Sequence, residues 1–126
     1  MTEAGPLERR AMNKGYMIFT LDVKDSDGMR KYMKAARATI TDDIRLLAVG
    51  TPEVLEGKWY GTTTVIMEFA NADAARAWFG SSAYKEASEF RHAASDAKVA
   101  ILDGFDTQAY AQSSPEDVVD LFGDLL

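Results

Sequence analysis

The segment Val54-Leu55-Glu56-Gly57-Lys58-Trp59 leads into an apolar run that ends Val65-Ile66-Met67-Glu68-Phe69, and Asn71 follows shortly after that run. The apolar run alternates as a strand does, and the glycine before Lys58 is typical of a hairpin connection. Asn71 is a good helix N-cap, and Asp73 lies in the first turn, where a negative charge is favourable. This stretch therefore predicts a hairpin, a strand over 62–69 and a helix packed against it.

Working outward from this stretch, periodicity and capping residues predict the remaining elements. We expect a strand over 15–23, then a helix capped by Asp25 or Ser26 that ends before Arg45, then an interrupted strand over 46–49 and 53–55. The strand over 62–69 follows, then a helix after Asn71 that kinks or restarts at 80–82, and a short strand over 98–102. The apolar helix stripes are predicted at Met29, Tyr32, Met33, Ala36 and Ile40, and at Ala83, Ala87, Phe90 and Ala94. The β-α-β-β-α-β order predicts an α+β fold, the ferredoxin-like sandwich.

The sheet of such a fold carries its helices on one face only. The other face is expected to hold Tyr16, Ile18 and Ile66, which are too apolar to leave in water. A second copy of the same sheet is the simplest cover. The pattern therefore predicts a homodimer in which two sandwiches form a dimeric α/β barrel.

Length and composition narrow the class of protein. The chain of 126 residues has the size of one domain. Residues 1–13 contain no apolar core segment and are expected to form a flexible N-terminal arm, not a secretory signal. No apolar run approaches the ~20 residues of a membrane span, and the absence of cysteine excludes disulfides and thiol catalysis. A cytoplasmic location is the resulting expectation.

The net charge of −6 is concentrated at one end of the chain. Residues 1–98 carry all 14 Lys and Arg residues and 14 of the 20 Asp and Glu residues, so that part is formally neutral. Residues 99–126 carry the remaining acids and no basic side chain. Because neither part offers a basic patch, nucleic acid is not expected as a partner.

Several separated motifs occur together in this chain. They are Leu55-Glu56-Gly57-x-Trp59, Glu68-Phe69, Ala77-Trp78-Phe79, Ser81, Tyr84, Arg91 and the strand-ending Asp103-Gly104. In this order they resemble the domain of unknown function 1330 family over about residues 14–104. The resemblance implies a ferredoxin-like fold that pairs into a dimeric barrel, and it implies no established reaction. Related barrels include cofactor-independent monooxygenases, small isomerases and haem-degrading enzymes, which is an analogy at the level of fold.

The chain also departs from the family pattern. Thr41-Asp42-Asp43-Ile44 stands where the family usually has a Tyr-Gly-Gly-like turn, and Tyr60-Gly61-Thr62 stands where Pro and Arg are common. If that basic residue helps the family to bind an anionic ligand, the ability is lost or changed here.

No strong catalytic motif is present, whether P-loop, dinucleotide fingerprint, nucleophile elbow or zinc-protease helix. His92 is the only histidine, which argues against a metal centre and against haem ligation, and we expect no cofactor. The alternative for His92 is an ordinary residue on a helix surface.

Two groups of polar side chains are candidates for catalysis. Tyr84, Ser88 and Arg91 share one helical face, so that Arg91 could hold a carboxylate or enolate while Tyr84 donates a hydrogen bond. The alternative is that Arg91 pairs structurally with Glu56 or Glu68. Either glutamate is a candidate acid or base, against the alternative of a strand-end Glu68 satisfied by backbone donors or arginine.

The ligand-binding candidates are apolar. Trp59, Tyr16 and Ile18 are proposed as the walls of a pocket, with a dimer contact as the alternative for Trp59. Trp78 lies beside Phe79 on the apolar side of its helix and is expected in the core.

These features lead to two hypotheses about function. The first is a small homodimeric barrel that binds, and in its stronger form transforms, a small organic molecule between sheet and helices, as an oxygenase or an isomerase would. The second is a non-catalytic scaffold protein whose acidic C-terminal extension, residues 105–126, recruits a partner.

The C-terminal extension predicts an amphipathic helix. Ser114 is its cap and Pro115 its first residue, and an apolar face follows at Val118, Val119, Leu121, Phe122, Leu125 and Leu126. Such a helix is expected to dock on its own subunit, across the dimer or on another protein. Docking within the protein predicts that truncation after Asp106 lowers the melting temperature or shifts the dimer toward monomer.

Overall fold

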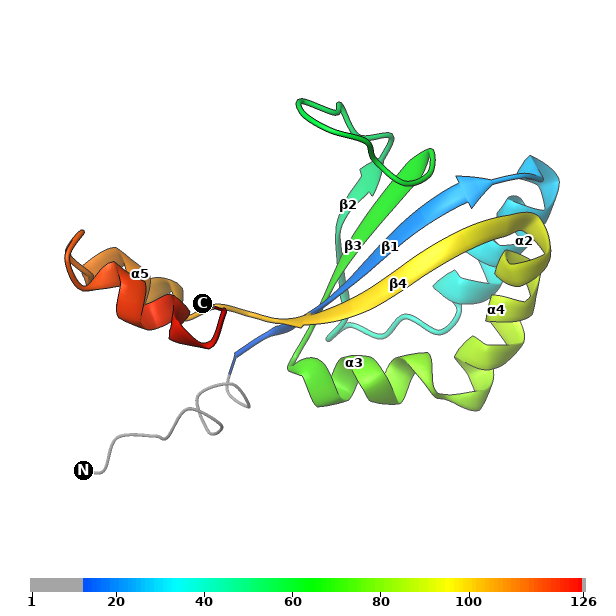
Figure 1. Ribbon diagram of the computed structural model, residues 1–126. Coiled ribbons are helices and arrows are strands. Elements are labelled where there is room, and N and C mark those ends of the chain that lie inside the picture. Colours follow the sequence, from blue (N-terminus) through cyan, green and yellow to red (C-terminus); the bar gives the residue numbers. More distant parts are fainter. Residues whose placement is uncertain (1–12, 126) are drawn as a thin grey trace.

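The computed structural model describes residues 13–125, and the proposed N-terminal arm lies almost wholly outside this range. The chain folds in the expected order, with the second helix restarted and two short elements added at the end (Figure 1). The elements are β1 (Gly15–Val23), α2 (Ser26–Arg37), β2 (Arg45–Gly50), β3 (Thr63–Phe69), α3 (Ala72–Phe79), α4 (Ser82–Ala94), β4 (Ser95–Asp103), α5 (Thr107–Gln112) and the 3₁₀ helix η1 (Val118–Leu125).

The strands form an antiparallel sheet in the order β2-β3-β1-β4, as the ferredoxin-like prediction requires. Helices α2, α3 and α4 lie on one face of this sheet, and none of them covers the other face (Figure 1). We call the uncovered side the open face. Because β1 lies between β3 and β4, its alternate residues define the two faces for the whole sheet.

The core lies between the sheet and the helices. Met17, Phe19 and Leu21 of β1 are buried there together with Met67 and Phe69 of β3. The helices contribute Met29, Ala75, Trp78, Tyr84 and Ala94. Burial of each large apolar side chain is worth about 1.5–3 kcal/mol, which makes this layer the main source of stability.

Tyr16, Ile18, Ile66 and Glu68 lie on the open face, as the alternation predicts, and each is half-buried within the single chain. Ala100 and Leu102 of β4 are exposed beside them, since Ala100 pairs with Ile18 and Leu102 with Tyr16. The open face is therefore apolar along its middle and accessible to solvent in the isolated chain.

Two predicted helix stripes need correction. Met33 of α2 is 61% exposed and does not belong to the buried stripe. On α4, Ala83 and Phe90 are exposed, and the buried face instead holds Tyr84, Ala87, Ser88, Arg91 and Ala94. The predicted restart at residues 80–82 is confirmed, since Ser81 caps α4 by accepting a hydrogen bond from the Tyr84 amide at 3.2 Å.

The strand predicted over 53–55 is wrong. Residues 51–62 form a loop between β2 and β3, and Figure 1 shows it standing at one end of the sheet, away from the helices. Pro52 has no amide hydrogen to continue pairing, and the register of β2 already shifts between Leu46 and Ala48. The strand therefore ends at Gly50.

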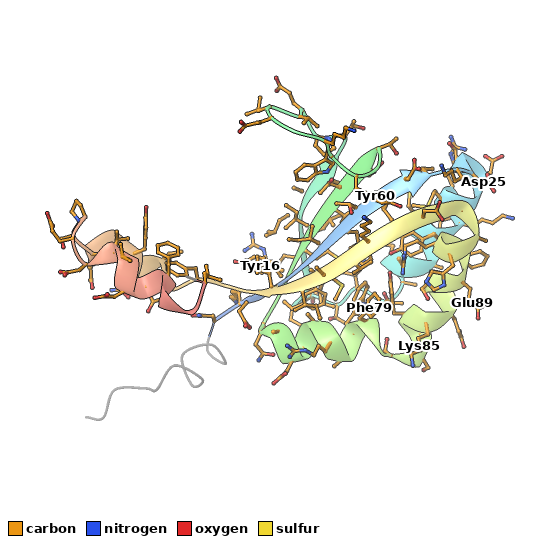
Figure 2. The ribbon with its side chains drawn as sticks, in the orientation of Figure 1. Tyr16, Asp25, Tyr60, Phe79, Lys85 and Glu89 are labelled. Carbon is orange, nitrogen blue, oxygen red and sulfur yellow. The ribbon has the colours of Figure 1, made fainter. Side chains whose placement is uncertain are left out.

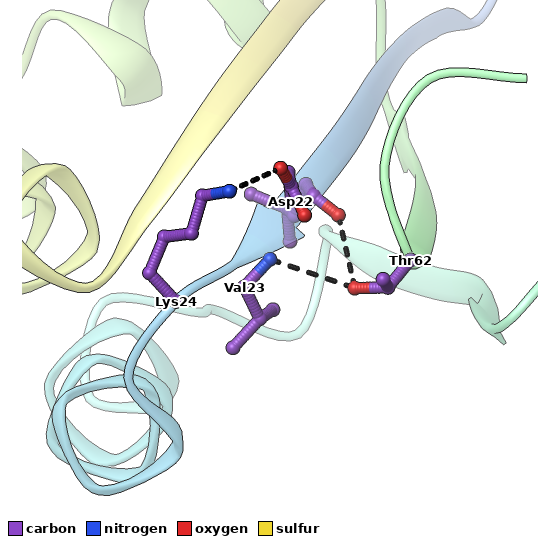
Figure 3. A network of polar contacts seen from close by, with 5 residues as sticks. Asp22, Val23, Lys24 and Thr62 are labelled. Atoms are coloured by element: carbon purple, nitrogen blue, oxygen red, sulfur yellow. Dashed lines mark hydrogen bonds and ion pairs between the residues drawn. The ribbon is translucent and has the colours of Figure 1, made fainter.

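The end of this loop, just before β3, is held against β1 by hydrogen bonds. The Thr62 amide donates to the Leu21 carbonyl at 2.7 Å, and the Thr62 hydroxyl lies 3.5 Å from the Val23 amide (Figure 3). Lys24 pairs with Asp22 at 2.7 Å beside these contacts. Gly61 has φ of +79°, and a side chain there would meet the Leu21 backbone. This close approach requires glycine.

The C-terminal extension folds on itself. Phe105 stacks on Phe122 with ring centroids 5.1 Å apart, and Tyr110 lies edge-on to both rings. The predicted cap is confirmed, since the Ser114 hydroxyl accepts from the Asp117 amide at 3.2 Å. The helix itself is a 3₁₀ helix and not the predicted α-helix, consistent with the low helix propensity of Val118, Val119 and Gly123. Figure 1 shows α5 and η1 beyond the end of β4, away from α2, α3 and α4.

Among residues 13–125, Gly57 and Gly61 have positive φ, and they allow a matched test of the contact between Gly61 and β1. Gly61→Ala is expected to destabilise the protein by clearly more than Gly57→Ala, since both pay about 1–2 kcal/mol for the left-handed backbone and only Gly61 also meets the Leu21 backbone. Chemical denaturation of both variants measures the difference. Equal losses of stability would contradict the anchoring role of Gly61.

The extension gives a second test. Because its aromatic side chains pack on one another, truncation after Asp106 is expected to change the melting temperature of the remaining chain by no more than about 2 °C. A loss of several degrees would show that the extension docks on the body. A shift in mass toward monomer, measured by light scattering, would show docking across a dimer.

Candidate functional site

Four of the candidate residues fall into two clusters on opposite faces of the sheet. Tyr84 and Arg91, with Tyr32, form what we call the helix-side cluster. Glu68 and Tyr16, with Arg45, form the open-face cluster described below.

In the helix-side cluster, the hydroxyl groups of Tyr32 and Tyr84 are hydrogen-bonded at 2.8 Å. Tyr84 is fully buried, with its ring 4.0 Å from that of Trp78 between centroids. Arg91 is 4% exposed, and its guanidinium carbon lies 5.5 Å from the centre of the Phe19 ring and 6.0 Å from that of Tyr32. Aromatic rings therefore surround a buried cation and a pair of hydroxyl groups.

Local structure fixes where these side chains point. The Ser81 hydroxyl donates to the Trp78 carbonyl at 2.7 Å, which holds the turn between α3 and α4. Helix α4 begins directly after this turn. Tyr84 and Arg91 lie two helical turns apart on its buried side. At the end of the helix the Ser95 hydroxyl donates to the Arg91 carbonyl at 2.9 Å.

The Arg91 guanidinium is short of partners. Nη2 of Arg91 lies 3.3 Å from Nε2 of His92, and the side chain also interacts with Tyr32. Among residues 13–125, Nε of Arg91 has no hydrogen-bond partner. None of the ion pairs of the described residues includes Arg91. A buried charge without a counter-charge is costly, so this arrangement is complementary to an anion.

Tyr32 stays neutral and can donate a hydrogen bond. Burial raises the pKa of Tyr32, and the neighbouring Tyr84 raises it further, while Arg91 acts in the opposite direction. Either hydroxyl can be the donor within the pair. Since one proton is used between the two oxygens, the other remains available for an acceptor near Arg91.

The expected convergence of Arg91 with Glu68 or Glu56 does not occur. Glu68 shares the face of Tyr16 and Ile66, whereas α4 packs on the opposite face, so the sheet separates Glu68 from Arg91. Glu56 is exposed in the loop between β2 and β3. The alternative of a structural ion pair between Arg91 and either glutamate is therefore also wrong.

The open-face cluster connects neighbouring strands. The Tyr16 hydroxyl donates to Oε2 of Glu68 at 3.1 Å, and Arg45 Nη1 lies 3.5 Å from Oε1 of the same carboxylate. The register places Glu68 directly between the two, opposite Tyr16 on β1 and Arg45 on β2. Burial raises the pKa of Tyr16, and the hydrogen bond to Glu68 raises it further. This is the alternative in which an arginine satisfies a strand-end glutamate.

The proposed walls also belong to the open face. Trp59 is 52% exposed and donates from Nε1 to the Thr64 hydroxyl at 3.1 Å. A shallow hollow of about 280 Å³ lies nearby, lined by Ala48, Val49, Gly50, Thr51, Pro52, Thr64 and Ile66. Figure 2 shows Tyr16 and Tyr60 toward opposite ends of the sheet and Phe79 on the helix side. Tyr16, Ile18 and Trp59 therefore do not line the helix-side cluster.

Two members of the clusters were not among the candidates. Tyr32 was assigned to an apolar stripe, although a buried tyrosine needs a partner for its hydroxyl, and this need was the available signal. The sequence predicts only that the first helix ends before Arg45, and no sequence pattern indicates the register shift in β2 that accompanies the pairing of Arg45 with Glu68.

Two further searches covered only the described residues. No three His, Asp or Glu side chains between residues 13 and 125 lie close enough to hold a metal ion. None of the helices in that range has the length and apolar character needed to cross a membrane.

Solved structures similar to this one share its fold. A protein of unknown function from Rhodopseudomonas palustris has a TM-score of 0.63 at 15% identity, over 75% of this chain and 84% of that chain. SnoaB, a cofactor-independent oxygenase from Streptomyces nogalater, has a TM-score of 0.55 at 10% identity, over 82% and 98%. A dimeric ferredoxin-like protein of unknown function from Thermobifida fusca has a TM-score of 0.53 at 14% identity, over 72% and 91%.

None of the curated proteins matches the chain. A family comparison does give a match, with the family described as "Domain of unknown function (DUF1330)", over residues 14–105. This range includes every strand of the sheet and all three helices packed on it, together with both clusters. The chain therefore belongs to the domain of unknown function 1330 family.

Proposed function

We propose that the protein is a small homodimeric barrel that binds a small organic anion, such as a carboxylate or an enolate, at the helix-side cluster. The observation that carries the proposal is the buried Arg91 guanidinium with an unpartnered Nε and no carboxylate partner among the described residues. A ligand oxygen would supply the missing charge and hydrogen bonds.

The surroundings of Arg91 indicate what kind of anion would fit. The rings of Phe19 and Tyr32 lie against the guanidinium, and such aromatic surroundings suit a ligand with a flat apolar part. The Tyr32–Tyr84 hydroxyl pair can donate to a second ligand oxygen. A ligand that combines a carboxylate with an aromatic or enolic group meets both demands.

Transformation of the ligand is the stronger form of the proposal. Arg91 and Tyr84 would stabilise negative charge that develops on a ligand oxygen, as an enolate or phenolate requires in oxygenase- or isomerase-type chemistry. Glu68 lies beyond the sheet and Glu56 in the loop, so proton transfer at this site falls to the tyrosine pair. Among proteins of the same fold, SnoaB is described as a cofactor-independent oxygenase.

The homodimer follows from the open face. Ile18, Ile66, Ala100 and Leu102 form an apolar area that no helix of the described chain covers. A second sheet packed face to face would remove this area from water. The similar protein from Thermobifida fusca is described as dimeric, which supports the same arrangement here.

One observation favours a second candidate, a dimeric scaffold protein without catalysis. The C-terminal extension projects beyond β4 and exposes Tyr110, Val119 and Leu125 (Figure 1). These side chains could engage another protein. The two candidates differ in whether the purified protein retains an organic anion that depends on Arg91.

The role of Arg91 is tested by Arg91→Met, which keeps the length of the side chain and removes its charge. In ligand-free protein, prepared by unfolding and refolding, the substitution is expected to leave the free energy of unfolding unchanged or to raise it by about 1 kcal/mol or more, because an unpaired buried charge is lost. Sodium benzoate, as a probe, is expected to raise the melting temperature of the unmodified protein and not that of the variant.

Arg76→Met is the matched control, since Arg76 is exposed and pairs with Asp73 at 2.6 Å on α3. This variant is expected to keep the response to benzoate, and sodium chloride at equal concentration should produce none. A loss of several kcal/mol in ligand-free Arg91→Met would assign Arg91 a structural role instead. Mass spectrometry of compounds released from the freshly purified protein would identify a natural ligand.

Assembly is tested separately. Light scattering at micromolar concentration is expected to give about twice the chain mass of 13.9 kDa. The reason is the cost of leaving the apolar open face in water. A monomer under these conditions would rule out the barrel and leave the helix-side cluster as a site within a single chain.

A further inference from the structure

We propose that the loop between β2 and β3, residues 51–62, is a rigid arm that holds the second copy of the chain. We call this segment the arm. The inference rests on the homodimer proposed above and assigns the contact that extends the dimer beyond its sheets.

The arm borders the open face at both of its ends. Thr51 and Pro52 at its start line the same hollow as Thr64 and Ile66 of β3. Near its end, Trp59 donates to the hydroxyl of Thr64. A partner chain that packs on the open face must therefore also contact the arm.

Several contacts hold the base of the arm in place. Thr62 is hydrogen-bonded to the backbone of β1 (Figure 3). Gly61 packs against the same backbone. Tyr60 lies under the Lys98 ammonium group of β4, with 4.4 Å between the nitrogen and the ring centre. These contacts tie the arm to β1 and β4 as well as to its own strands, so its tip is carried on a fixed support.

The tip of the arm is apolar and has no cover within the described chain. Leu55 is 88% exposed and Val54 is 45% exposed. A leucine at this exposure adds nothing to the stability of the single chain, whereas burial against a partner would remove its apolar surface from water.

A second copy is the occupant that fits these observations. The surface of the arm continues that of the open face, which a second sheet is proposed to cover. The charged residues of the arm are Glu53, Glu56 and Lys58, so the tip carries little net charge and two copies do not repel each other there. In a two-fold dimer both arms make the same contact, so the contact occurs twice in the assembly and buries both apolar tips.

The test measures the dimer dissociation constant by analytical ultracentrifugation for single substitutions to aspartate. Leu55→Asp is expected to raise the constant at least tenfold, because a charge would be buried in the contact. The side chain is so exposed that the fold of the single chain should not change, and far-ultraviolet circular dichroism checks this. Val54→Asp gives an independent second variant at the same tip.

Two control variants separate this inference from the dimer itself. Met33→Asp places the same charge at an exposed apolar residue of α2, on the helix side, and is expected to leave the constant unchanged. Ala100→Asp introduces a charge at an exposed position of the open face and is expected to weaken or abolish the dimer.

The outcomes are distinguishable. If Ala100→Asp dissociates the dimer and both Leu55→Asp and Val54→Asp leave the constant unchanged, the arm does not hold the partner and the proposed dimer stands. If the unmodified protein is a monomer, the inference and the dimer both fail. If the tip variants and Ala100→Asp weaken association while Met33→Asp does not, the arm is part of the dimer contact.

Discussion

The alternation of side chains along β1 is the constraint on which the rest of the structure depends. This strand pairs on both sides, so its two sets of alternate residues set the faces of β3 and β4 as well. One face packs against the helices through Met17, Phe19 and Leu21. The other face carries Tyr16 and Ile18. A shift of one residue in register would exchange the two sets and place polar side chains in the core.

The same division explains why the sequence predicted the fold better than the site. The strand and helix patterns are local, and the order of elements was correct, including the restart of the second helix at residues 80–82. The site required knowing which candidates share a face. Glu68 is one residue from Phe69, but the two side chains lie on opposite sides of the sheet, so proximity in the chain gave no proximity to Arg91.

The residues that surround Arg91 could not be predicted from the sequence either. Tyr32 comes from α2 and Phe19 from β1, and only the packing of α2 against α4 and of both against the sheet brings them to the guanidinium. A buried arginine is ordinarily expected beside a carboxylate, and the described chain supplies a tyrosine pair and a histidine nitrogen instead. This departure from the ordinary pattern carries the functional proposal.

The two tryptophans of the chain are divided in the same way as its clusters. Trp78 lies in the core, with its ring 4.0 Å from that of Tyr84, and Trp59 lies at the base of the arm on the open face. The fluorescence of each indole therefore reports a different event. Occupation of the helix-side cluster would change the emission of Trp78, and assembly of two chains would change that of Trp59. Replacing one indole at a time by phenylalanine would turn this chain into two separate optical sensors without any added label.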